Sequence, residues 1–80
     1  KDIVEIGKKL LKHPELTEEE YCEVAEVIAD ALYEDKNYKE ALKYYKEIVF
    51  YPKDGKLIKR SYSKLKEIEE ILSLEKMLKE

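Results

Sequence analysis

Nine carboxylates lie within residues 15–35, and the same stretch contains no lysine or arginine. Side chains of this kind can serve as general acids or bases, hold cations, or attract the basic groups of a partner. The rest of the chain is mildly basic: residues 1–14 carry a net charge of +2 and residues 36–80 a net charge of +4, which leaves −3 in total. The chain is therefore electrically two-sided, and this pattern favours attraction of a basic partner.

Catalysis and metal binding require companions that these carboxylates lack. His13 is the only histidine and Cys22 the only cysteine, and neither has a partner at catalytic or metal-ligand spacing. No nucleophile, base and orienting residue can be assembled. We therefore expect a protein that is not an enzyme and that uses no cofactor or metal.

Composition narrows the class further. Eighty residues make one domain over residues 1–80, and charged residues make up 44% of it. No apolar run approaches the roughly 18 residues of a membrane helix, so no membrane association is expected. A single cysteine favours a reducing compartment, which predicts a cytoplasmic protein. One arginine and no glycine-rich phosphate loop disfavour nucleic-acid binding.

Apolar residues recur at helical spacing and predict an all-α fold, an antiparallel array of three to four helices. The predicted helices span about 2–12, 18–35, 38–50 and 55–79. Thr17 and Glu20 have the spacing of a capping box at the start of the second helix. Asn37 is expected to cap the third helix. Only Lys36 and Asn37 separate the second helix from the third, so these two should be antiparallel neighbours.

The fourth helix is predicted from a turn at residues 52–55, with Asp54 as its cap and a break near Ser73. Its periodic apolar positions include Tyr62, which is expected in the core. At 25 residues it would be longer than the others, which points to a terminal cap or to a homodimer interface on helix 55–79.

The second and third helices together resemble a tetratricopeptide repeat, a helix-turn-helix unit of 34 residues. Tyr38 stands at the consensus tyrosine, Ala29 and Ala41 at the small positions where the two helices cross, and Tyr45 at the aromatic position. The resemblance implies right-handed repeat packing, with the fourth helix as a C-terminal capping helix.

The match departs from the consensus at Ala25, Lys36 and Ile48, where a tryptophan-type residue, a turn glycine and a second alanine are usual. A second family competes. Microtubule-interacting-and-transport (MIT) domains are three-helix bundles with a similar Asn-Tyr-x-Glu-Ala-Leu-x-x-Tyr junction, present here from Asn37 to Tyr45. Their second helix usually runs longer than residues 38–50, and they lack an obligatory helix like residues 2–12.

In tetratricopeptide geometry the first helix of each hairpin lines the concave groove. The resemblance therefore implies an acidic groove formed by Glu23, Glu26, Asp30, Tyr33 and Glu34. Such a groove would suit a helix or extended peptide that carries lysine or arginine. A merely solvated helix face explains part of the pattern, because acids near a helix N-terminus favour the macrodipole. The repeated like-charge spacing costs helix stability, which favours a function.

These observations predict a non-catalytic protein–protein interaction or scaffolding module that presents an acidic helix face to a basic peptide or helix. Three alternatives stay open. One is an MIT-like adaptor that binds a partner helix. Another is an acidic inhibitor whose carboxylates imitate nucleic-acid phosphates. The third is a designed structural domain without a ligand.

Overall fold

The computed structural model describes residues 2–50 and 55–79, and this part of the chain consists of four helices without strands. They are α1 (Asp2–Leu11), α2 (Glu18–Glu34), α3 (Tyr38–Val49) and α4 (Gly55–Lys79). The predicted all-α class is confirmed, and each bound lies within one residue of the expectation. The expected break near Ser73 is wrong, because α4 is continuous there. The predicted turn with its Asp54 cap lies outside the described residues.

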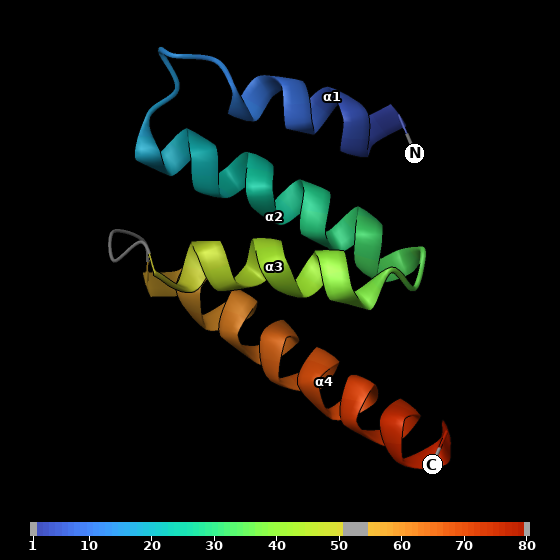
Figure 1. Ribbon diagram of the computed structural model, residues 1–80. Helices are drawn as coiled ribbons and strands as arrows, with labels where there is room; N and C mark the ends of the chain where they lie inside the picture. The colour runs from blue at the N-terminus through green and yellow to red at the C-terminus, as the bar shows by residue number, and fades with distance from the viewer. Residues whose placement is uncertain (1, 51–54, 80) are drawn as a thin grey trace.

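The helices lie side by side in chain order (Figure 1). Helix α2 packs on α1 and on α3, α3 packs on α4, and α2 and α4 touch only slightly. The molecule measures 46 × 28 × 15 Å, so the array is flat. Helices α1 and α4 are therefore the two edges, and each has one main neighbour.

Small side chains let the central helices approach closely. Ala25 and Ala29 of α2 and Ala41 of α3 are all completely buried. Tyr45 and Ile48 of α3 fill the space beside them, also without exposure. The expected crossing residues are thus in the core.

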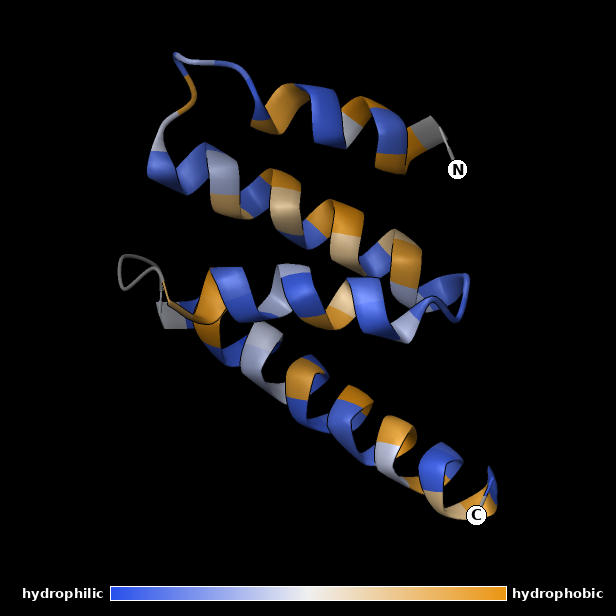
Figure 2. Cartoon of the chain, viewed as in Figure 1, coloured by the Kyte–Doolittle hydropathy of each residue, from blue (hydrophilic) through white to orange (hydrophobic). Residues whose placement is uncertain are grey.

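Apolar residues also recur along both edge helices, α1 and α4 (Figure 2).

Helix α4 buries Leu57, Ser61, Leu65 and Ile68. Tyr62 is 51% exposed, so its predicted core position is wrong. The physical reason is that Ser61, which is completely buried, occupies the position where α4 approaches its neighbour, and this turns Tyr62 toward solvent.

The capping box of α2 is confirmed. The Thr17 hydroxyl accepts a hydrogen bond from the Glu20 N–H at 3.1 Å, and the Glu20 carboxylate accepts one from the Thr17 N–H at 3.0 Å. The hydrogen bond from the Thr17 backbone, followed by one from the Thr17 side chain, lowers the pKa of the Glu20 carboxyl group. The start of α2 is therefore set by local sequence.

The end of α2 is a Schellman motif. Lys36 adopts a positive φ of 62°, its N–H donates to the Tyr33 carbonyl at 3.0 Å, and the Asn37 N–H donates to the Leu32 carbonyl at 2.8 Å. Asn37 holds the cap position of α3, but its side chain makes no capping hydrogen bond, so that expectation is wrong. Its backbone ψ of 69° lies outside the extended region usual for a cap, because the residue also closes α2.

Replacing Lys36 by glycine should stabilise the fold. A left-handed conformation costs a side-chain-bearing residue about 1–2 kcal/mol, and glycine escapes this at a smaller cost in the unfolded chain. We expect Lys36→Gly to raise the free energy of unfolding by about 0.5–1 kcal/mol in urea titrations. Lys36→Ala, which keeps the unfavourable φ, should show no such gain. Equal effects of the two changes would contradict this account.

Gly7 allows α1 to lie close to α2. A Cβ at this position would stand 2.5 Å from Ile28 Cγ1 and 2.8 Å from Ile28 Cδ1, and Ile28 is completely buried. We expect Gly7→Ala to lower the free energy of unfolding by about 1–2 kcal/mol, because overpacking outweighs the gain in helix propensity. Gly55→Ala is the matched control, since nothing lies within 4 Å of its Cβ position. Urea unfolding of both variants measures these changes. An unchanged free energy of unfolding in Gly7→Ala would show that α1 can move away from α2 without cost.

Candidate binding groove between α2 and α4

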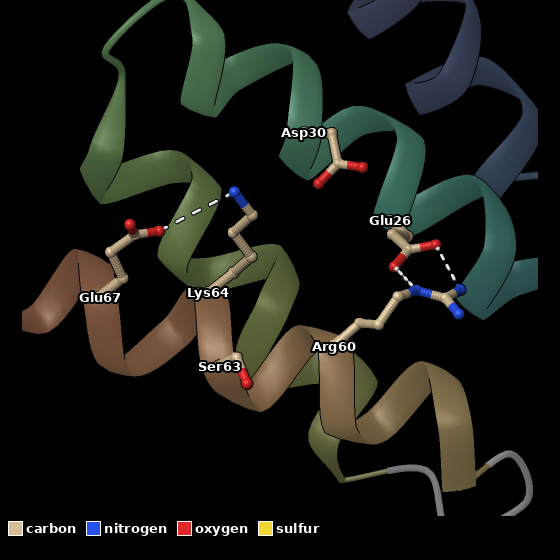
Figure 3. Close-up of a pocket in the computed structure, with 6 residues that line it drawn as sticks. All are labelled: Glu26, Asp30, Arg60, Ser63, Lys64 and Glu67. Atoms are coloured by element: carbon tan, nitrogen blue, oxygen red, sulfur yellow. Dashed lines mark hydrogen bonds and ion pairs between the residues drawn. The ribbon is translucent and has the colours of Figure 1, made fainter.

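A groove of about 590 Å³ lies between α2 and α4, where α3 holds these two helices apart (Figure 3). Glu26 and Asp30 enter it from α2. From α4 it is lined by Arg60, Ser63, Lys64 and Glu67. Three carboxylates therefore face two cations, and the groove is more nearly neutral than α2 alone would make it.

Arg60 and Glu26 form a two-pronged ion pair across the groove. The Arg60 Nε lies 3.1 Å from Glu26 Oε2, and Nη2 lies 3.1 Å from Oε1. The Glu26 side chain is 19% exposed and the Arg60 side chain 61% exposed. Planar paired hydrogen bonds fix geometry well, although a solvated pair adds little stability. The bridge ties α4 to α2 where the two helices otherwise touch little.

Asp30 is anchored from beneath. The hydroxyl of Tyr45, a completely buried residue of α3, donates a hydrogen bond to the Asp30 carboxylate. Burial, followed by this hydrogen bond and by the charges of Asp30 and Glu26, raises the pKa of Tyr45 above its ordinary value of 10.0. Tyr45 therefore stays protonated and keeps donating, and the Asp30 carboxylate stays fixed on the groove wall.

Tyr33 joins the two helices at another point. Its hydroxyl donates to Glu67 Oε2 at 2.8 Å, and Lys64 Nζ lies 4.2 Å from its ring centroid. Lys64 also lies 3.8 Å from Glu67 (Figure 3). The hydrogen bond to Glu67 is the main reason that the pKa of Tyr33 is raised. The ring packs edge-on against Tyr38 at a centroid distance of 5.6 Å.

The structure distributes the five predicted site residues unequally. Glu26 and Asp30 line the groove, and Tyr33 contacts the α4 residues beside it. Glu23 instead lines a second groove, between α1 and α2, and Glu34 is exposed and lines neither. The five residues thus share one helix but not one cavity.

The α4 side of the groove was absent from the sequence-based prediction. Arg60, Lys64 and Glu67 are four and then three residues apart, so they share one face of a helix. That spacing was a usable signal. The sequence does not show, however, how α4 is rotated against α3, and this rotation decides whether the face with Arg60, Lys64 and Glu67 is turned toward α2.

Among residues 2–50 and 55–79, no group of three or more histidine, cysteine, aspartate or glutamate side chains is placed to hold a metal ion. The groove residues form ion pairs and hydrogen bonds with one another. No helix in the described part of the chain is long and apolar enough to cross a membrane. Comparison with family models, curated proteins and solved structures gives no match to this chain.

The raised pKa of Tyr45 predicts a specific alkaline instability. Above pH 10 the unfolded chain loses the Tyr45 proton while the folded chain retains it. The contribution of this group to the free energy of unfolding is therefore fully present below pH 10 and falls as the pH rises further. At pH 7, Tyr45→Phe should cost about 1 kcal/mol, the value of one hydrogen bond. We expect this deficit to shrink above pH 10, because phenylalanine cannot ionise.

Urea unfolding of both proteins at pH 7, 10 and 11 measures this difference. The remaining ionisable groups are common to both chains and cancel in the comparison. A deficit that stays constant across this range would show that the Tyr45 proton is not linked to folding.

Proposed function

We propose that this protein is a non-catalytic interaction module that binds a basic segment of another protein along α2. The observation that carries the proposal is the placement of the α2 acids. Glu23, Glu26, Asp30 and Glu34 follow one another at intervals of three and four residues, and so form one stripe. Grooves border this stripe on both sides, one shared with α1 and one with α4.

The acids in this stripe have different roles. Glu26 is bridged by Arg60, and one oxygen of Asp30 accepts the Tyr45 hydrogen bond. A carboxylate has lone pairs for further donors, so Asp30 can still accept from a partner. Glu23 and Glu34 are exposed on either side along the helix. A lysine- or arginine-bearing helix or peptide would therefore pair chiefly with Glu23, Asp30 and Glu34.

Two features support tetratricopeptide-like packing as the framework for this function. The helices pack in chain order rather than all against one another, as stacked repeats do. Lys36, which stands where the repeat has its turn glycine, has the positive φ that glycine favours. We place this activity in the cytoplasm, in keeping with the single, buried cysteine Cys22.

Panning a phage-displayed peptide library on the folded protein tests the proposal. We expect the recovered peptides to be enriched in lysine and arginine over the input library. Charge reversal in Glu23→Lys/Glu34→Lys should weaken their binding about tenfold or more, and 0.3 M salt should weaken it for the unaltered protein.

The matched control is Glu69→Lys/Glu75→Lys, which makes the same change in net charge at exposed positions of α4. Equal losses in both variants would mean that only the overall charge matters. Recovery of peptides with no basic enrichment would refute the proposed function.

A further inference from the structure

A single stripe of side chains runs along the face of α4 that borders the α2–α4 groove. Its members follow one another at alternating intervals of four and three residues, which keeps them on one side of the helix. They are Arg60, Lys64, Glu67, Ile71, Leu74 and Leu78. We name them the α4 stripe. The charged first half lines the groove opposite Glu26 and Asp30 of α2 (Figure 3), and the second half is entirely apolar.

The apolar half of the α4 stripe lies beyond the end of α2. Tyr33, in the last turn of α2, donates its hydrogen bond to Glu67, the last charged member of the stripe. Helix α2 ends at the next residue, Glu34, whereas α4 continues to Lys79. Leu74 and Leu78 are accordingly 59% and 87% exposed. Figure 1 shows the last turns of α4 lying apart from the other helices, so the groove continues into an apolar surface that no other described residue covers.

The charges beside this surface favour a basic occupant. Asp30 lines the groove, Glu34 is exposed at the end of α2, and Glu70 is exposed on α4 where the stripe changes from charged to apolar. The lysines at this end of the molecule lie in a separate groove between α3 and α4, which is lined by Lys39, Leu72, Glu75, Lys76 and Lys79. A partner that lies along the α4 stripe therefore meets an acidic surface and then an apolar one.

A second copy of this chain fits the surface less well. On its own α4 stripe, the bases that precede the apolar half are Arg60 and Lys64. These already pair within the chain, with Glu26 at 3.1 Å and with Glu67 at 3.8 Å. A second α4 helix would thus bring apolar side chains but no uncommitted base on the same stripe.

We propose that the partner of this protein is a basic amphipathic helix that covers the α4 stripe. Its apolar residues pack on Ile71, Leu74 and Leu78, and its lysines or arginines lie beside Asp30 and Glu34. A helix is the fitting form, because side chains at intervals of three and four residues interlock with a stripe of the same spacing. This inference rests on the proposed function and specifies the basic segment as a helix that is apolar at one end.

The size of the stripe sets the length of the partner and the strength of binding. From Arg60 to Leu78 the stripe is about 27 Å long, which a helix of about 20 residues spans. Stable interfaces bury about 800 Å² on each partner, and a few exposed aliphatic side chains with neighbouring acids supply only part of this. We therefore expect a dissociation constant in the micromolar range.

Two synthetic peptides of about 20 residues test the proposal. The first has leucines at alternating intervals of three and four residues in one half and lysines in the other half. The second has the same composition in scrambled order, so it keeps the charge but loses the apolar stripe. In fluorescence anisotropy titrations with the full chain, we expect the first peptide to bind about tenfold more tightly than the second.

Variants of the protein locate the contact. Leu74→Ser should remove the advantage of the first peptide and leave binding of the scrambled peptide unchanged, and Leu78→Ser should reduce the same advantage. Ile6→Ser is the matched control, because Ile6 is 59% exposed, as Leu74 is, but lies on α1 at the opposite edge of the array. Circular dichroism confirms that each variant folds, as expected for exposed positions.

The charge reversal Glu23→Lys/Glu34→Lys separates this inference from the proposed function. Equal binding of both peptides, weakened for both by the charge reversal, would overturn the amphipathic helix and leave the proposed function intact. Failure of both peptides to bind would instead count against the proposed function itself. An advantage that Ile6→Ser removes and Leu74→Ser does not would place the apolar contact on α1 and overturn the inference.

Sedimentation equilibrium of the protein alone, up to about 1 mM, tests the competing occupant. We expect Leu74→Ser to leave the molecular mass unchanged. A dimer that Leu74→Ser dissociates would assign the α4 stripe to a second copy of the chain, and would overturn the proposal.

Discussion

The close packing of α2 between α1 and α3 is the constraint on which the rest of the structure depends. On one side α2 presents Ala25 and Ala29, both completely buried. On the other it presents Ile28, which fits the space that Gly7 leaves in α1. Both contacts require a residue without a bulky side chain at the crossing point. With two sides of α2 used in this way, only one face remains for solvent, and the acids of α2 gather there.

This constraint also places two acids of α2 within reach of side chains from the neighbouring helices. Tyr45 lies in the core that α2 and α3 share, and its hydroxyl reaches Asp30 at the surface. Arg60 reaches Glu26 from the neighbouring edge helix. The repulsion between neighbouring acids on α2 is thus partly offset by groups from α3 and α4.

Local sequence predicted the helices because their determinants lie within a few residues of one another. The Thr17–Glu20 capping box and the short Lys36–Asn37 link are of this kind. Exposure within a helix could not be predicted as well, because it depends on helix register. The stripe of Ile3, Ile6 and Leu10 reads as a core face, yet Gly7 makes the closest contact and leaves the isoleucines in solvent. The predicted core position of Tyr62 on α4 is wrong for the same reason.

The two edges of the array differ in a way that bears on association. Both end helices have one main neighbour, and a stacked array must protect its exposed edges. Toward its start, α4 has Lys59, Arg60 and Lys66 at exposed positions together with the half-exposed Tyr62. Its other exposed apolar side chains are Leu74, Met77 and Leu78 near its end. Helix α1 has only ten residues, and its apolar stripe runs along most of them beside an open groove. Both edge helices therefore leave apolar side chains uncovered, along the length of α1 and mainly near the end of α4.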